Sequence, residues 1–141
     1  MKVSDILKSK GSNVYSVTEN ITVYEALKIM GEKNVGALMV MEDERLKGII
    51  SERDYARKIV LKGKSSQETT VKEIMTEEVI SVLPEDSIEK CMELMSGRRI
   101  RHLPVMKDDK VLGVISITDV VTAIIESQKY TITQLENYIS R

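Results

Sequence analysis

The chain has 141 residues, of which 42% are hydrophobic and 30% charged, with a formal net charge of −1. This composition is typical of a soluble globular protein of about one ordinary domain, and it excludes a wholly disordered, collagen-like or coiled-coil chain. The near-zero charge argues against a protein that neutralises many nucleic-acid phosphates. Five tyrosines without Phe or Trp offer no aromatic platform for single-stranded bases.

Cysteine content and apolar runs set the expected compartment. Cys91 is the one cysteine, so no internal disulfide can form, and the N-terminus lacks an apolar stretch long enough for a secretory signal. The apolar run at residues 36–41 falls far short of a membrane span. We therefore predict a cytoplasmic protein with no membrane association.

The sequence repeats itself at an offset of 65 residues. Residues 16–54 align without gaps on residues 81–119, and 11 of the 39 pairs are identical. Ordinary residue usage would give about two identities by chance. The chain is therefore a duplication, and the match extends back in pattern from residues 71–75 to residues 3–7.

Each copy reads as β-α-β-β-α. In copy one, a short strand at residues 14–17 precedes an amphipathic helix that Thr22 caps, with Glu25 completing a capping box. Strands at residues 37–41 and 46–50 form a hairpin, and a second helix covers residues 51–62. In copy two the same elements fall at residues 79–82, a helix capped by Ser87, strands at 102–106 and 111–115, and a helix at 116–127.

These elements predict a mixed α+β fold of two repeats packed around a pseudo-twofold axis, because one copy alone would be a marginal domain. The predicted boundaries are 1–62 for repeat one, 63–70 for a linker and 71–128 for repeat two. A helical tail at 129–141 has apolar positions at Ile132, Leu135 and Ile139. We expect this tail to pack on the paired copies or on a second chain.

Enzymatic constellations are nearly absent from the sequence. His102 is the only histidine and Cys91 the only cysteine, so a zinc site of His and Cys ligands lacks side chains. Cys91 lies in the apolar row of a predicted helix, which favours a core residue over a nucleophile. Neither a complete phosphate-binding P-loop nor a G-x-G-x-x-G motif occurs. We therefore predict no catalytic residues, no metal and no catalytic cofactor.

A Gly-h-h-Ser-x-x-Asp segment, in which h is an apolar residue, ends both hairpins, at residues 48–54 and 113–119. A strand that opens onto a helix N-terminus can bind an anion, the serine can donate to a phosphate and the aspartate can accept from a ribose diol. The same Ser-x-x-Asp spacing is also a helix cap with no ligand, and the spacing alone favours the cap. The candidate residues are Ser51, Arg53, Asp54, Ser116, Thr118 and Asp119.

A basic cluster enters the middle strand of copy two, with four basic side chains between Arg98 and His102. Such a run is usually a solvated loop. Strand alternation nevertheless turns Arg101 and His102 to opposite faces, so at least one basic group should face the other copy, where a phosphate would neutralise it.

Together, these motifs resemble the cystathionine β-synthase (CBS) domain family. The resemblance rests on Asp5-Ile-Leu7 and Glu73-Ile-Met75, on both Gly-h-h-Ser-x-x-Asp segments and on Arg99-Ile-Arg-His-Leu-Pro-Val105. The resemblance covers essentially the whole chain. More narrowly, the chain is similar to stand-alone proteins that contain one pair of CBS domains, called a Bateman module.

The resemblance implies that adenosine ligands (AMP, ADP or ATP, in some members NAD or S-adenosylmethionine) bind in clefts between the repeats, with Asp on the ribose and Ser or Thr near the phosphate. It also implies that the middle strand of each repeat faces the Asp motif of the other. That arrangement assigns Val35, Gly36 and Ala37 to the Asp119 cleft, and Ile100, Arg101 and His102 to the Asp54 cleft, chiefly through backbone contacts to adenine; Thr76 is a further candidate.

The sequence thus predicts a non-enzymatic, homodimeric regulatory module that binds an adenine nucleotide and signals energy or redox state to an unidentified partner protein. Two alternatives stay open. One is a ligand-independent protein interaction module, and the other is an RNA or single-strand binder that uses the basic cluster, which the net charge disfavours.

Overall fold

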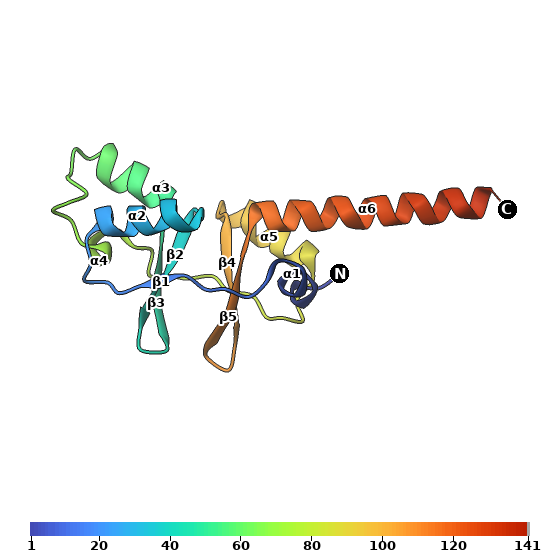
Figure 1. The fold of residues 1–141 in the computed structure, drawn as a ribbon, viewed down its shortest axis with the longest axis horizontal. Helices are drawn as coiled ribbons and strands as arrows, with labels where there is room; N and C mark the ends of the chain where they lie inside the picture. Colours follow the sequence, from blue (N-terminus) through green and yellow to red (C-terminus); the bar gives the residue numbers. More distant parts are fainter. Residues whose placement is uncertain (141) are drawn as a thin grey trace. The chain divides into compact units, whose positions relative to one another are not determined.

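The computed structural model describes residues 1–140 and divides the chain into two compact units. Unit 2 is the continuous segment Val14–Ile80, whereas unit 1 combines Met1–Asn13 with the chain from Ser81 onward. Both units contain short strands flanked by helices (Figure 1). The predicted α+β class is confirmed.

The sheet of unit 2 has the strand order β1-β2-β3. β1 (Ser16–Val17) runs parallel to β2 (Ala37–Glu42), which pairs antiparallel with β3 (Arg45–Ser51). Asp43 adopts a left-handed conformation in the hairpin turn, with φ of 56°, which Asp tolerates better than most residues. The predicted hairpin is confirmed, and β2 buries its first four residues.

The helices of unit 2 cover this sheet. α2 (Val23–Lys33) begins at Thr22, whose hydroxyl accepts from the Glu25 amide at 3.2 Å, and it buries Val23, Ala26 and Met30. Leu27 is partly buried against the same core, so the apolar face expected at positions i, i+3, i+4 and i+7 is confirmed. α3 (Glu52–Tyr55) continues directly into the π-helix η1 (Ala56–Val60), and α4 (Val71–Ile74) follows the linker.

Unit 1 has the same arrangement, but its sheet contains two strands instead of three. α5 (Ile88–Arg98) begins at the predicted cap Ser87, and β4 (His102–Lys107) pairs antiparallel with β5 (Lys110–Ser116). The strand predicted at residues 79–82 is only a single parallel bridge from Val82 to Val105. α1 (Val3–Lys10) and α6 (Ile117–Ile139) complete the unit.

Each unit contains the short lead-in helix of the other repeat. Val71 and Ile74 of α4 lie in the hydrophobic core of unit 2, with Val23 and Ile50. In unit 1, the Val3 amide of α1 donates to the Asp86 carbonyl at 2.9 Å. The compact units therefore combine the sequence differently from the predicted ranges 1–62 and 71–128, which describe the duplication.

α6 is longer than the sequence pattern predicts. A break was expected near residue 128, but the helix continues from Ile117 to Ile139, because no Gly or Pro interrupts residues 117–139. The tail is helical as predicted. Residues 125–140 are all exposed, so the tail does not pack on the paired copies, and packing on a second chain stays a prediction. Arg141, the last residue of the predicted tail, lies outside the described residues.

Candidate functional site

Both Ser-x-x-Asp segments form reciprocal helix caps. In unit 2 the Ser51 amide donates to Asp54 Oδ2 at 3.0 Å, and the Asp54 amide donates to Ser51 Oγ at 3.2 Å. In unit 1 the corresponding distances between Ser116 and Asp119 are 2.8 and 3.2 Å. The capping interpretation is therefore confirmed. A ligand must bind to oxygen lone pairs of the serine and aspartate that the caps do not use.

The glycine three residues before each serine has a packing role that capping alone does not explain. A Cβ at Gly48 would lie 2.7 Å from the Thr76 carbonyl oxygen, and a Cβ at Gly113 would lie 2.7 Å from Leu7 Cδ2. The lead-in segment of the other repeat thus crosses the strand at the glycine. This crossing places the lead-in residues next to the Asp motif.

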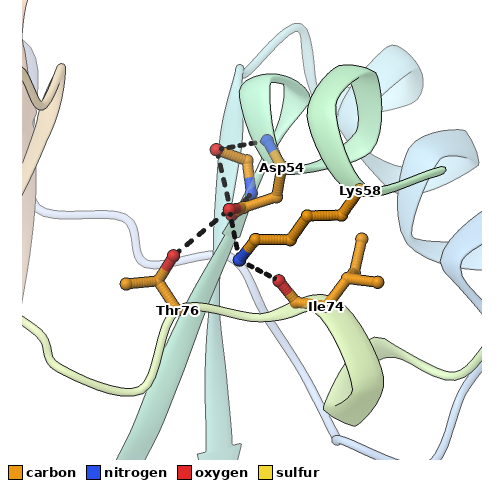
Figure 2. Close-up of polar contacts among 5 residues, drawn as sticks. Asp54, Lys58, Ile74 and Thr76 are labelled. Atoms are coloured by element: carbon orange, nitrogen blue, oxygen red, sulfur yellow. Dashed lines mark hydrogen bonds and ion pairs between the residues drawn. The ribbon is translucent and has the colours of Figure 1, made fainter. Parts of the chain in front are cut away.

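Asp54 is the centre of a polar network in unit 2. Thr76 Oγ1 donates to Asp54 Oδ1 at 3.2 Å, and Lys58 Nζ lies 3.1 Å from the same oxygen. Lys58 Nζ also donates to the Ile74 carbonyl at 2.7 Å, which is visible in Figure 2. Both carboxylate oxygens already accept hydrogen bonds from the protein, so a ribose hydroxyl would have to displace one of them.

Asp119 has a different set of partners in unit 1. Lys10 Nζ lies 2.7 Å from Asp119 Oδ2 and donates to the Val114 carbonyl at the same distance. Among the described residues, no hydrogen bond to Asp119 Oδ1 is present. The Asp119 side chain is 20% exposed against 12% for Asp54, so Asp119 retains an acceptor that a ligand can reach.

Electrostatics keep Asp119 ionised. Burial opposes its charge, but hydrogen bonds from Lys10 and Ser116 outweigh the burial and hold the pKa of Asp119 below its usual value. The Asp119 carboxylate is therefore an anionic acceptor at neutral pH.

Two of the predicted basic-cluster residues lie in the same part of unit 1. His102 pairs with Ser116 across β4 and β5, and the Arg101 carbonyl accepts from the Ile117 amide at 2.8 Å. Burial first, and then the nearby charges of Lys10 and Arg101, lower the pKa of His102, while Asp119 opposes that shift. The structure thus brings Arg101, His102, Ser116 and Asp119 together; the pairing of Arg101 and His102 with Asp54 stays a prediction.

A pocket of about 510 Å³ lies in unit 2 between α2, the loop that leads into β2, and α3. Its volume falls in the range of small-molecule sites. The predicted residues Val35 and Gly36 line it, while Ala37 is buried and Ser51, Asp54 and Thr76 are not part of the lining. The Gly36 carbonyl accepts from the Glu52 amide at 3.0 Å. The lining residues are Leu27, Met30, Gly31, Asn34, Val35, Gly36, Glu52 and Tyr55.

The remaining predicted residues flank these networks. Arg53 is half-buried in α3, Thr118 is exposed in the first turn of α6, and Ile100 follows the left-handed Arg99 at the end of α5. Within residues 1–140, no group of three or more His, Cys, Asp or Glu side chains could hold a metal ion. No helix in that part of the chain has the length and apolar character to cross a membrane.

The two lysines that contact the motif aspartates are not among the predicted site residues. Lys58 follows Asp54 by four residues, a spacing that brings side chains together on a helix and could have identified it. Lys10 precedes Asp119 by 109 residues, so no local pattern points to it.

The comparisons with known proteins agree with this architecture. The CBS domain model matches residues 3–61 and 71–126. The CBS domain-containing protein CBSX3, mitochondrial, from Arabidopsis thaliana is 45% identical over 97% of this chain and 71% of its own length. That name places the plant protein in mitochondria, and the cytoplasmic location of the present chain stays a prediction.

Solved structures extend the similarity to the fold. A candidate signal-transduction protein with CBS domains from Burkholderia ambifaria MC40-6 has a TM-score of 0.88 and 48% identity, covering 91% of this chain and 96% of that one. The CBS domain pair of protein MJ0100, in complex with methylthioadenosine and S-adenosyl-L-methionine, has a TM-score of 0.80 and 29% identity, covering 90% and 98%. With both repeats matched by the family model and the fold shared throughout, this chain belongs to the CBS domain family.

Proposed function

We propose that this CBS-domain regulatory protein binds an adenine nucleotide, AMP, ADP, ATP or NAD, and is not an enzyme. The observation that carries the proposal is the surroundings of Asp119: an ionised carboxylate with an unoccupied oxygen, next to Lys10, Arg101 and His102. A carboxylate can accept from both hydroxyls of a ribose, and the adjacent cations Lys10 and Arg101 can neutralise a phosphate.

The MJ0100 complex supports the adenosine part of this ligand, because that relative holds two adenosine compounds. The Ser116 hydroxyl would donate a hydrogen bond to the phosphate, and Thr118 would lie beside Ser116. In unit 2 the same roles would fall on Ser51, Asp54, Arg53 and Thr76, once a ligand displaces Lys58 or Thr76 from Asp54.

The proposed signalling step is a shift between two arrangements of the protein. A ligand can shift such an equilibrium only by its difference in affinity for the two states. We infer that the protein acts as a homodimer and passes the change to a partner protein. The hexameric CBS-CP12 protein of bloom-forming cyanobacteria is a relative that assembles into an oligomer.

Two measurements test the proposal. Mass spectrometry of small molecules released from the purified, denatured protein should detect an adenosine compound. AMP, ATP or NAD should raise the melting temperature, and the double change Asp54→Ala with Asp119→Ala should abolish that rise. An absence of binding to any adenosine compound at millimolar concentration would reject the proposal.

The alternative is a ligand-independent interaction module, which the fully occupied carboxylate of Asp54 favours. This alternative predicts that the double aspartate variant leaves partner binding intact while nucleotides have no effect. An RNA-binding role would require binding at low salt by the Arg98–His102 cluster, and filter binding would detect it.

A further inference from the structure

The C-terminal part of α6 presents an apolar stripe that stays exposed in the described part of the chain. In Figure 1 this part of α6 runs beyond α1 and α5 of its own unit. Its large apolar side chains recur at alternating spacings of four and three residues, with Gln128 in the one polar position. The exposed apolar members of the stripe are Val121 at 41%, Ile125 at 46%, Ile132 at 54%, Leu135 at 56% and Ile139 at 79%.

Contacts within the chain contribute little to the stability of this part of the helix, because residues 125–140 are exposed. In proteins, most of the stability of a helix comes from the packing of its amphipathic face. This segment also contains Thr131, Thr133 and Asn137, which are weak helix formers. A partner that covers the stripe would supply the missing stabilisation.

The spacing of the stripe is that of a coiled-coil seam. When Ile125, Ile132 and Ile139 occupy position a of a heptad, Gln128 and Leu135 occupy position d. Ile at a with Leu at d favours two parallel helices. The stripe therefore fits a second helix of the same kind.

Gln128 indicates that the second helix is another copy of this chain. A glutamine amide both donates and accepts hydrogen bonds, so a Gln128 from a second copy in register satisfies it, whereas an apolar partner residue would leave it unpaired. The g positions of the heptad are Ile124, Thr131 and Tyr138, which are uncharged. Lys129 and Glu136, both at position e, therefore meet no like charge across a parallel seam.

We propose that α6 pairs with α6 of a second copy as a parallel, in-register coiled coil, with Gln128 opposite Gln128. The pairing rests on the proposed homodimer for its partner but not on nucleotide binding. It is isologous, so the same residues contribute from both copies and the assembly closes at two. Because the seam spans fewer than three heptads, the dimer should dissociate on dilution.

One matched pair of variants tests the seam. Gln128→Lys places two ammonium groups opposite each other in the seam, whereas Gln134→Lys adds the same charge at an outward heptad position of the same helix. Both glutamines are exposed in the single chain, so both variants should fold with the wild-type melting temperature at dilutions where the wild type is monomeric.

Sedimentation velocity over a concentration series gives the result. We expect twice the chain mass for the wild type and Gln134→Lys, and the chain mass for Gln128→Lys at the same concentrations. A dimeric Gln128→Lys would overturn the α6 seam and leave the homodimer standing. A wild type that is monomeric at every concentration would overturn both.

Cysteine substitution tests the register. Two Gln128→Cys chains should form an interchain disulfide under mild oxidation, because facing d positions bring the Cα atoms within bonding range. Gln134→Cys should form far less, and the native Cys91 is buried. Equal cross-linking of the two variants, or none at residue 128, would overturn the parallel pairing.

Discussion

Lys10 Nζ lies 2.7 Å from Asp119 Oδ2, although 109 residues separate them in the sequence. The contact joins the end of α1, near the start of the chain, to the first turn of α6. The Val114 carbonyl accepts a second hydrogen bond from the same ammonium group. Lys10 thus holds the lead-in helix of repeat one on the strand and helix of repeat two.

Lys10→Met should lower the free energy of unfolding by about 1 kcal/mol at neutral pH, since the ion pair is partly exposed and screened by water. The pKa of Asp119 is lowered in the folded state, so its contribution is present above the unfolded value and is lost as the pH falls through the folded value. Urea unfolding at pH 7 and at about pH 2 measures the free energy of unfolding of both proteins. The difference in this free energy between variant and wild type should be smaller in acid. A difference that stays constant would contradict this account.

His102 should make the protein less stable in mild acid. Its pKa is lowered in the folded state, so below about pH 6.5 the unfolded chain binds more protons and stability falls with the pH until the folded value is passed. His102→Gln should remove this part of the pH dependence. Urea midpoints between about pH 7.5 and pH 5 measure this pH dependence. If the midpoint changes equally with pH in the variant and the wild type, His102 is not its cause.

The two motif glycines should tolerate alanine unequally. In Gly48→Ala the new Cβ meets the Thr76 backbone carbonyl at 2.7 Å, so the variant should lose about 1–3 kcal/mol of stability. In Gly113→Ala the nearest atom belongs to the flexible Leu7 side chain, and the loss should be smaller. Thermal unfolding measures both.

Gly97→Ala is the matched control for these substitutions. Gly97 lies in α5 with open space around it, so alanine there should be neutral or stabilise by up to about 1 kcal/mol. A loss at Gly113 equal to that at Gly48 would show that the lead-in segments are equally rigid, contrary to the geometry.

The two motif aspartates should contribute unequally to nucleotide binding. Asp119 has an oxygen available, whereas Asp54 must first release Lys58 or Thr76. Calorimetric titration with AMP should therefore show at least a tenfold loss of affinity for Asp119→Asn, because hydrogen bonds to charged groups contribute about 1.5–3 kcal/mol. Asp54→Asn should mainly lower the melting temperature. A larger loss of AMP affinity for Asp54→Asn than for Asp119→Asn would contradict this prediction.

The elements that local chemistry determines were predictable from the sequence. Apolar spacing located α2 and α5, and Thr22 and Ser87 located their first turns. The two hairpins followed from apolar runs around acidic turns. The Ser-x-x-Asp caps were predictable for the same reason, because a cap joins residues only three positions apart.

Long-range contacts were not predictable in this way. The apolar character of Val71 and Ile74 indicates burial but not which repeat buries them. The strand expected at residues 79–82 is only a bridge at Val82, since β propensity needs a partner strand to become a ladder. The contact of Thr76 with Asp54 follows from the path of the lead-in segment, which no periodicity encodes.

The exchange of lead-in helices also determines where the chain could be divided. A cut inside the linker at residues 63–70 would remove Val71 and Ile74 from the core of unit 2 and leave Gly48 facing empty space. The continuous segment Val14–Ile80 keeps that core whole. In the sequence, unit 2 is thus inserted between the two segments of unit 1. A shortened gene that keeps unit 1 whole would therefore join residue 13 to residue 81, rather than divide the chain between its repeats.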